Sequence, residues 1–185
     1  MVRTHRLLVR LALLVAVLAL PAAARAQDHY TFSAAVLGGL GGSPDVDGAN
    51  YGNGGFQVNL GMVTEPRTIL GLRVGHLSLN RPEPFGSLTG AGLSYATIGG
   101  EYRFRETYYD SGIYLALGAY RLTGTDAFGA SRDRTAAGVS LGFTGEFPLT
   151  RRLGVLVELS GHYADLRREG VQLFGMGHAG VMWHF

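Results

Sequence analysis

The last fifteen residues, Val171 to Phe185, restrict the fold most strongly, because their side chains alternate strictly between two kinds. Every second residue is apolar or glycine, and this set comprises Val171, Leu173, Gly175, Gly177, Ala179, Val181, Trp183 and Phe185. A period of two is that of a β-strand, whose successive side chains point to opposite faces. The stretch therefore predicts a long strand with one wholly apolar face.

The same period recurs upstream and divides the chain into eight runs separated by turn residues. The expected strands cover residues 30–40, 55–63, 68–79, 93–104, 112–122, 139–147, 153–163 and 171–185. No segment after the first 26 residues keeps the 3.6-residue period of a helix, and a glycine costs about 1 kcal/mol at each interior helix position. With 29 glycines in the chain, the pattern predicts an all-β protein.

The third run contains one irregularity. Up to Val74 the apolar residues keep one parity, and after His76 they continue as Leu77 and Leu79 on the other. A change of parity within a strand is what a β-bulge produces. The sequence therefore predicts a bulge near His76.

Connections and aromatic residues are distributed regularly. Long loops at 41–53, 80–90 and 124–134 alternate with short turns. Aromatic residues near the chain ends or the short turns are Tyr30, Phe32, Tyr102, Phe104, Tyr108, Tyr109, Phe147, Trp183 and Phe185. Aromatics at one level of a barrel form an interfacial girdle, so the pattern favours a barrel that spans a membrane.

Residues 1–26 predict a cleaved export signal. Arg3, Arg6 and Arg10 precede a ten-residue apolar run, and Ala24-Arg25-Ala26 supplies the small-residue cleavage site. The mature domain is then 27–185, with 12 basic and 14 acidic residues and a net charge of −2, which gives no electrostatic reason to expect nucleic acid as a partner. The chain has no cysteine, which excludes disulfides, a lipid anchor on cysteine and a thiolate metal site.

The composition of the second face distinguishes membrane barrels from soluble ones. A soluble barrel or an immunoglobulin-like sandwich would carry charge on one parity of nearly every strand. Here the polar parity holds few charges among glycine, serine, threonine and tyrosine, and the remaining charges are concentrated in the loops. That composition suits a narrow interior filled by side chains.

The signal, the eight alternating runs, the glycine-rich loops and the terminal Trp183-His184-Phe185 together resemble the small outer-membrane β-barrels, the family of outer membrane protein X and of the membrane domain of outer membrane protein A. The resemblance implies an eight-stranded antiparallel up-and-down transmembrane β-barrel in the bacterial outer membrane. It implies lipid and lipopolysaccharide as neighbours, and periplasmic chaperones and the barrel-assembly machinery as partners during biogenesis. Trp183 and Phe185 would be the assembly signal. Because nothing follows Phe185, no periplasmic domain is expected.

The inward parity carries five charged residues that predict an ion-pair network in the lumen: Arg73, Glu101, Arg103, Glu146 and Glu158. Folding the chain about its short turns places Asn59 beside Arg73 and Gly142 beside Glu158. Such a network can be a gated polar path or an ion-pair plug. The plug is favoured, because eight strands enclose only enough space for side chains.

No catalytic, cofactor or metal site is expected. His162-Tyr163-Ala164 is similar to the His-x-Ser arrangement of outer-membrane lipid A deacylases, but Ala164 replaces the nucleophile. His178 and His184 are about 20 Å apart along a strand, too far to share a metal. Asp45, Asp47, Asn50 and Asn53 lack the frame of a calcium loop.

Two functional hypotheses remain. The first is a structural or surface-interaction role through the extracellular loops, because a rigid barrel that presents loops commonly divides its work in this way. Arginines at the outer rim that could pair with lipopolysaccharide phosphates are Arg81, Arg132, Arg134, Arg167 and Arg168. The alternative is a small lumenal or lateral conduit or binder for apolar molecules. It would use a pocket left by Gly71, Gly99, Gly118 and Gly142 and lined by Tyr95, Tyr120 and Phe174.

Overall fold

The computed structural model describes residues 31–43, 53–79, 88–105, 108–126, 128–166 and 171–185. The expected signal 1–26 and Tyr30 lie outside the described residues, as do the loop arginines at 81, 167 and 168 and Asp45, Asp47 and Asn50 of the calcium-loop comparison. Among the described residues, no helix has the length and apolar character needed to cross a membrane.

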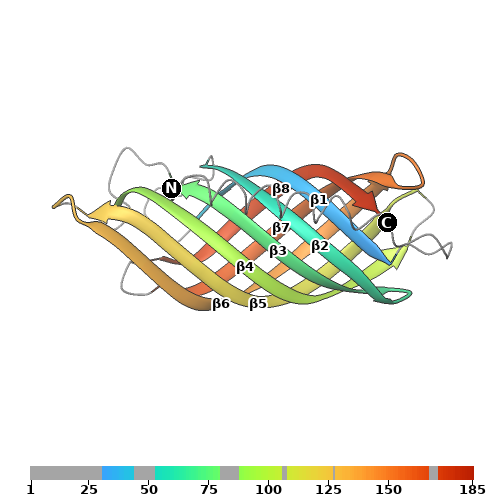
Figure 1. The fold of residues 1–185 in the computed structure, drawn as a ribbon, viewed down its shortest axis with the longest axis horizontal. Coiled ribbons are helices and arrows are strands. Elements are labelled where there is room, and N and C mark those ends of the chain that lie inside the picture. The colour runs from blue at the N-terminus through green and yellow to red at the C-terminus, as the bar shows by residue number, and fades with distance from the viewer. Residues whose placement is uncertain (1–30, 44–52, 80–87, 106–107, 127, 167–170) are drawn as a thin grey trace, which may run out of the picture.

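Eight antiparallel strands form a closed barrel in chain order (Figure 1). They are β1 (Phe32–Gly42), β2 (Asn53–Glu65), β3 (Thr68–Leu79), β4 (Leu88–Arg105), β5 (Asp110–Asp126), β6 (Ser131–Pro148), β7 (Leu153–Leu166) and β8 (Val171–His184). The last strand returns to the first, with a ladder that runs from Ser33 opposite His184 to Gly42 opposite Gly175. The all-β, eight-stranded up-and-down barrel expected from the sequence is confirmed.

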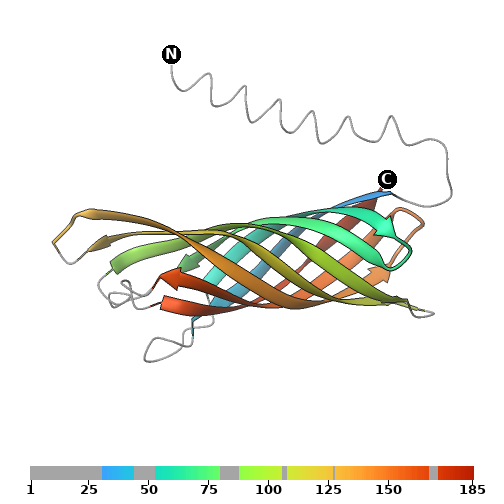
Figure 2. The same ribbon diagram turned by 90° about the horizontal axis from the view of Figure 1, so that it is seen from below.

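The short connections after β2, β4 and β6 lie at the same end of the barrel as the C-terminus, and we call it the turn end (Figure 2). The opposite end carries the connections after β1, β3, β5 and β7, of which the first two are the longest in the barrel, and we call it the loop end. Successive connections lie at alternate ends because each strand of an up-and-down barrel runs antiparallel to the one before it.

The prediction of a third long loop at residues 124–134 is wrong, because most of these residues belong to strands. The β5–β6 ladder continues to Thr125 opposite Ser131. Gly129 lies in the connection with a φ of 81°, a left-handed conformation that glycine adopts without strain. Arg121 also bonds Asp133 across the ladder, which favours continued pairing over an open loop.

The prediction of a β-bulge near His76 is also wrong. The register is continuous there, with His76 opposite Phe56 and Leu77 opposite Gly55. Leu77 and Leu79 are buried on the same inward parity as Arg73. What changes after His76 is therefore the polarity of the inner face, which becomes apolar toward the loop end, while the strand itself stays regular.

One of the two expected cross-strand pairs is confirmed. Asn59 lies opposite Arg73, but Glu158 lies opposite Thr144, because Gly142 pairs with Ser160. The turn at 149–152 sits one residue later than expected, since Thr150 Oγ1 accepts hydrogen bonds from the backbone amides of residues 152 and 153. This one-residue displacement of the turn moves the pairing by two residues.

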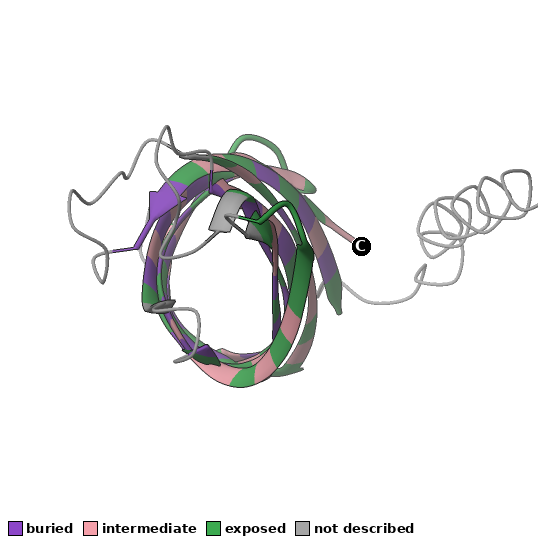
Figure 3. Cartoon of the chain, turned by 90° about the vertical axis from the view of Figure 1, so that its left-hand side faces the viewer, coloured by how far each residue is buried: buried purple, intermediate pink, exposed green. Residues whose placement is uncertain are grey.

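The outer surface of the barrel is apolar. Buried and exposed residues alternate along each strand (Figure 3). Large exposed hydrophobic side chains include Val36, Phe56, Leu70, Leu72, Val74, Ile98, Leu115, Leu117, Leu141, Phe143, Leu159 and Val181. A continuous apolar belt around a closed barrel is the surface that a bilayer requires.

Aromatic side chains ring the turn end of this belt. Those of the expected girdle that are exposed in the structure are Phe32, Tyr102, Phe104, Tyr108, Tyr109, Phe147 and Trp183. Neighbouring rings contact one another, with centroids 5.1 Å apart for Tyr102 and Phe104 and 6.4 Å apart for Trp183 and Phe185. Rings at this level match the interfacial position of aromatic residues in membrane barrels.

The belt yields a prediction about depth. Leu117 lies midway along the outward row of β5 and is 64% exposed. In a bilayer, Leu117→Arg should lower the free energy of unfolding by about 2–4 kcal/mol, whereas Thr123→Arg, near the polar rim, should cost about 0–1 kcal/mol. Urea unfolding in lipid vesicles, followed by the fluorescence of Trp183, the single tryptophan, measures both. Equal losses at the two positions would contradict a lipid-facing belt.

Candidate functional site

The inner face of the barrel has two zones. Toward the loop end it is apolar, and toward the turn end it is mainly polar, with a smaller apolar cluster of Ala35, Leu37, Leu156 and Met182. The apolar zone, which we call the outer plug, is one packed cluster of Leu77, Leu79, Ala91, Leu93, Tyr95, Tyr120, Leu122, Ala164, Leu166, Phe174 and Met176. The polar zone holds the five charged residues expected in the lumen, so the candidate site lies between the outer plug and the turn end.

Glu158 is the centre of the polar zone and is fully buried. Its Oε1 accepts hydrogen bonds from Gln57 Nε2 at 2.9 Å and from the Tyr114 hydroxyl at 2.8 Å. Its Oε2 accepts from Asn59 Nδ2 at 3.0 Å and from Arg73 Nε at 3.2 Å. Four donors from three other strands thus compensate the desolvation of one carboxylate, which is the condition for a charge to remain buried.

From Glu158 the ion pairs continue toward the turn end. Arg73 Nη2 bonds Glu101 Oε2 at 2.6 Å, and Arg103 Nε bonds Glu101 Oε1 at 3.0 Å. Arg103 also pairs with Glu146, which contacts His184 Nε2 in turn. The structure therefore places all five expected residues in one continuous chain of charges, which we call the ion-pair network.

Sequence reasoning missed several members of this network. Gln57, Tyr114 and Thr144 supply neutral donors, the last through Thr144 Oγ1 to Glu101 Oε1 at 2.8 Å. His184 was considered only as a metal ligand. All four lie on the inward parity of their strands, so the parity could have marked them, although it could not show which acceptor they reach.

Arg73 also makes an aromatic contact. Its guanidinium carbon lies 3.5 Å from the centroid of the Tyr114 ring. A cation over an aromatic face gains about 2 kcal/mol or more when it is desolvated. Because the same tyrosine donates to Glu158, Tyr114 holds both partners of the central ion pair in place.

The outer plug leaves little support for the apolar pocket considered from the sequence. Tyr95, Tyr120 and Phe174 are at most 3% exposed and pack within the plug. The inward glycines face neighbouring groups: a Cβ on Gly142 would meet the Tyr114 ring, and one on Gly118 would overlap the backbone carbonyl of Ala96. Gly142 and Gly118 therefore accommodate close neighbours and do not open space.

His162 lies at the base of the outer plug. Its Nδ1 is 3.0 Å from the Tyr120 hydroxyl and its Nε2 is 2.9 Å from Ser160 Oγ. At 2% exposure it is closed to a lipid substrate, and Ala164 beside it has no nucleophile. Within the described part of the chain, no group of three or more histidine or acidic side chains is placed to hold a metal.

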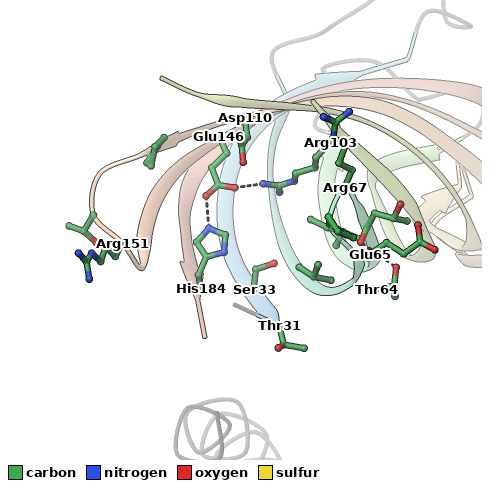
Figure 4. A pocket seen from close by; sticks show the side chains of 16 residues that line it. Thr31, Ser33, Thr64, Glu65, Arg67, Arg103, Asp110, Glu146, Arg151 and His184 are labelled. Atoms are coloured by element: carbon green, nitrogen blue, oxygen red, sulfur yellow. Dashed lines mark hydrogen bonds and ion pairs between the residues drawn. The ribbon is translucent and has the colours of Figure 1, made fainter. Parts of the chain in front are cut away.

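A vestibule of about 550 Å³ opens at the turn end (Figure 4). Its charged lining consists of Glu65, Arg67, Arg103, Asp110, Glu146, Arg151 and His184, and its hydroxyl lining of Thr31, Ser33, Thr64, Thr68 and Thr150. Figure 4 shows Arg103 and His184 reaching Glu146 from two sides. The ion-pair network thus ends in a space open to solvent at the turn end.

No protein-family model and no curated protein matches the sequence. Neisserial surface protein A superimposes with a TM-score of 0.68 at 12% identity over 84% of this chain and 97% of that one. Ail, the attachment invasion locus protein of Yersinia pestis, gives 0.58 at 14% identity over 83% and 96%. The N-terminal β-barrel domain of Pseudomonas aeruginosa OprF gives 0.58 at 12% identity over 83% and 97%.

These likenesses, together with the apolar belt, define the class. The chain has the fold of the eight-stranded bacterial outer-membrane β-barrels. Identities of this size establish the fold alone. The expected assembly signal stays a prediction: Trp183 is exposed on the belt, and the amide of Phe185 donates to the carbonyl of Phe32.

The Glu158 contacts generate a prediction about stability. Glu158→Leu should lower the free energy of unfolding by about 3–5 kcal/mol, because it removes the acceptor of four buried donors and leaves Arg73 with one partner fewer. The double variant Arg73→Met/Glu158→Leu should lose less, since both charges are then removed. Urea unfolding compares the three proteins. Unchanged stability in the single variant would mean that Glu158 is solvated.

The two zones generate a prediction about solvent access. Because the chain has no cysteine, single Ser→Cys replacements report on one site each. Ser33 lines the vestibule, whereas Ser140 is 1% exposed on the loop side of the network. In folded protein, a charged methanethiosulfonate should modify Ser33→Cys much faster than Ser140→Cys. Equal rates would contradict an interior that opens at the turn end only.

Proposed function

We propose that the protein is an integral protein of the bacterial outer membrane with a structural or surface-interaction role at its extracellular end. In barrels of this class the short turns and both termini face the periplasm, so the loop end would be extracellular. The observation that carries the proposal is the protruding hairpin of β5 and β6. Its β5 strand stays paired with β4 as far as Asp126 opposite Leu88, and the tip beyond that last pair has no part in closing the sheet.

We call residues 121–135, the end of β5, the start of β6 and the connection between them, the ribbon. Within the described residues, the ladder between β6 and β7 begins at Gly138 opposite Ala164, whereas β6 continues to pair with β5 as far as Ser131. Figure 1 shows β5 and β6 reaching past the other strands at the end opposite the C-terminus. At the tip, Phe128 is 96% exposed. A large apolar side chain held out on a paired ribbon is a suitable anchor for a partner protein.

The charges of the ribbon suit a polar partner surface around that anchor. Arg121 donates to Asp133 through two nitrogens, with Nε at 2.8 Å from Oδ1. Both side chains are about half exposed, so their pairing orders the ribbon without burying it. Arg132 and Arg134 lie on the same strand. They belong to the arginines proposed to meet lipopolysaccharide phosphates at the outer rim.

The names of similar proteins point in the same direction. One is called a surface protein and another an attachment invasion locus protein. These roles belong to those proteins, and they support a surface role here only as an analogy of fold. The further partners of the proposal are outer-membrane lipid around the belt, and periplasmic chaperones and the barrel-assembly machinery during biogenesis.

Shortening the ribbon tests the proposal. Leu122 pairs with Arg134, so replacing residues 123–133 by Asn-Gly should close a two-residue hairpin. The shortened protein should still reach the outer membrane and shift its mobility on heating, because it loses only the outermost pairs of the β4–β5 and β5–β6 ladders. It should lose the surface phenotype that the full chain restores to a deletion strain. Phe128→Ser is the matched point variant, and it should weaken that phenotype with the ribbon still in place.

The outcome that would reject the proposal is full rescue by the shortened barrel. In that case the function would reside in the barrel itself, and the conduit hypothesis would take its place. Filling the lumen with Gly118→Phe would not test the conduit hypothesis, because any Cβ at this position overlaps the Ala96 carbonyl and would disturb the strand itself. Planar-bilayer recording is the better measurement, and large stable conductance would also contradict a plugged interior.

A further inference from the structure

Two side-chain atoms of residues that bond Glu158 lack a hydrogen-bond partner among the described residues: Asn59 Oδ1 and Arg73 Nη1. The other polar atoms of these side chains are occupied. Asn59 Nδ2 and Arg73 Nε bond Glu158, and Arg73 Nη2 bonds Glu101. Both residues are buried, at 9% and 3% exposure. A buried polar atom without a partner costs about 1–3 kcal/mol, and more when the group is charged.

Both side chains line the same small cavity. Its volume is about 20 Å³, and its lining also includes Ser33, Gly71 and Glu101. A water molecule needs about 10–15 Å³ of such volume and two to four polar partners. One unpartnered atom is an acceptor and the other is a charged donor, so a single water can satisfy both. A cation is disfavoured, because the Arg73 guanidinium faces the space.

The cavity adjoins the vestibule. Ser33, Ile69 and Arg103 line both spaces, so the cavity and the vestibule share part of their walls. On the other side, the outer plug closes the lumen with packed apolar side chains. Water therefore has a short path to the cavity from the turn end and a packed apolar barrier from the loop end.

We propose that this cavity is an internal water site. One water molecule accepts a hydrogen bond from Arg73 Nη1, donates one to Asn59 Oδ1, and exchanges with solvent through the vestibule. The water completes the ion-pair network, which is thereby hydrated from the turn end alone. This site is independent of the proposed surface role of the ribbon.

Gly71→Ala tests the site. Gly71 lines the cavity, and a Cβ at this position would lie 3.1 Å from Arg73 Nη1, with no backbone atom closer than 3.9 Å. The added methyl group would therefore occupy space beside the Arg73 nitrogen that the water bonds. Gly100→Ala is the matched control: Gly100 lies on the adjacent strand opposite Leu70, faces outward, and has nothing within 4 Å of its Cβ position.

The two interpretations of the cavity predict opposite results. If it holds water, Gly71→Ala displaces the water, and the urea midpoint should fall below that of Gly100→Ala. If it is dry, the methyl group fills a void, and the midpoint of Gly71→Ala should equal or exceed that of Gly100→Ala, which would overturn the proposal.

A high-resolution crystal structure separates loss of water from displacement of Arg73. The unsubstituted protein should show one ordered water within hydrogen-bond distance of Asn59 Oδ1 and Arg73 Nη1, and Gly71→Ala should lack it. A cavity without density in the unsubstituted protein, or closed by a direct contact between the two side chains, would overturn the proposal. Because these measurements do not involve the ribbon, their failure would leave the proposed surface function untouched.

Discussion

Closure of the sheet is the constraint on which the rest of the structure depends. In a bilayer core no water is available to satisfy an open strand edge, so β1 and β8 must pair along their length. The ladder from Ser33 opposite His184 to Gly42 opposite Gly175 does this. Two glycines allow the seam to close, because a Cβ on Gly39 would overlap the carbonyl of Gly177 and one on Gly180 would overlap that of Val36.

A barrel of eight strands has an interior only wide enough for side chains, and this protein fills it in two ways. Toward the loop end, leucine and aromatic side chains pack as in a soluble core. Toward the turn end, three carboxylates and two guanidinium groups form a connected network with neutral donors and His184. The charged zone requires near-complete hydrogen bonding, because a desolvated charge without partners would be too costly. Glu158, with four donors, shows how this is met.

The division of the interior gives the two ends of the molecule different properties. The turn end opens into a vestibule that reaches Glu146 and Arg103, whereas the loop end is closed by the outer plug and carries the ribbon with Phe128 exposed at its tip. A barrel filled with side chains is a rigid support, and in proteins built this way the surfaces at the ends of the support commonly carry the function. The two proposals concern opposite ends and depend on different residues.

The sequence by itself determined the number of strands, the facing of their side chains and the identity of the inward charges. A period of two assigns each residue to a face, which is why Arg73, Glu101 and Glu158 could be expected in the lumen. Only the tertiary structure decided what these residues meet. The donors of Glu158 come from β2, β3 and β5, and alternation along one strand carries no information about distances across the lumen. The pairing of Glu158 with Thr144, the regular strand through His76 and the long ribbon depended likewise on turn position and on packing between strands, because register is set by contacts between segments far apart in the chain.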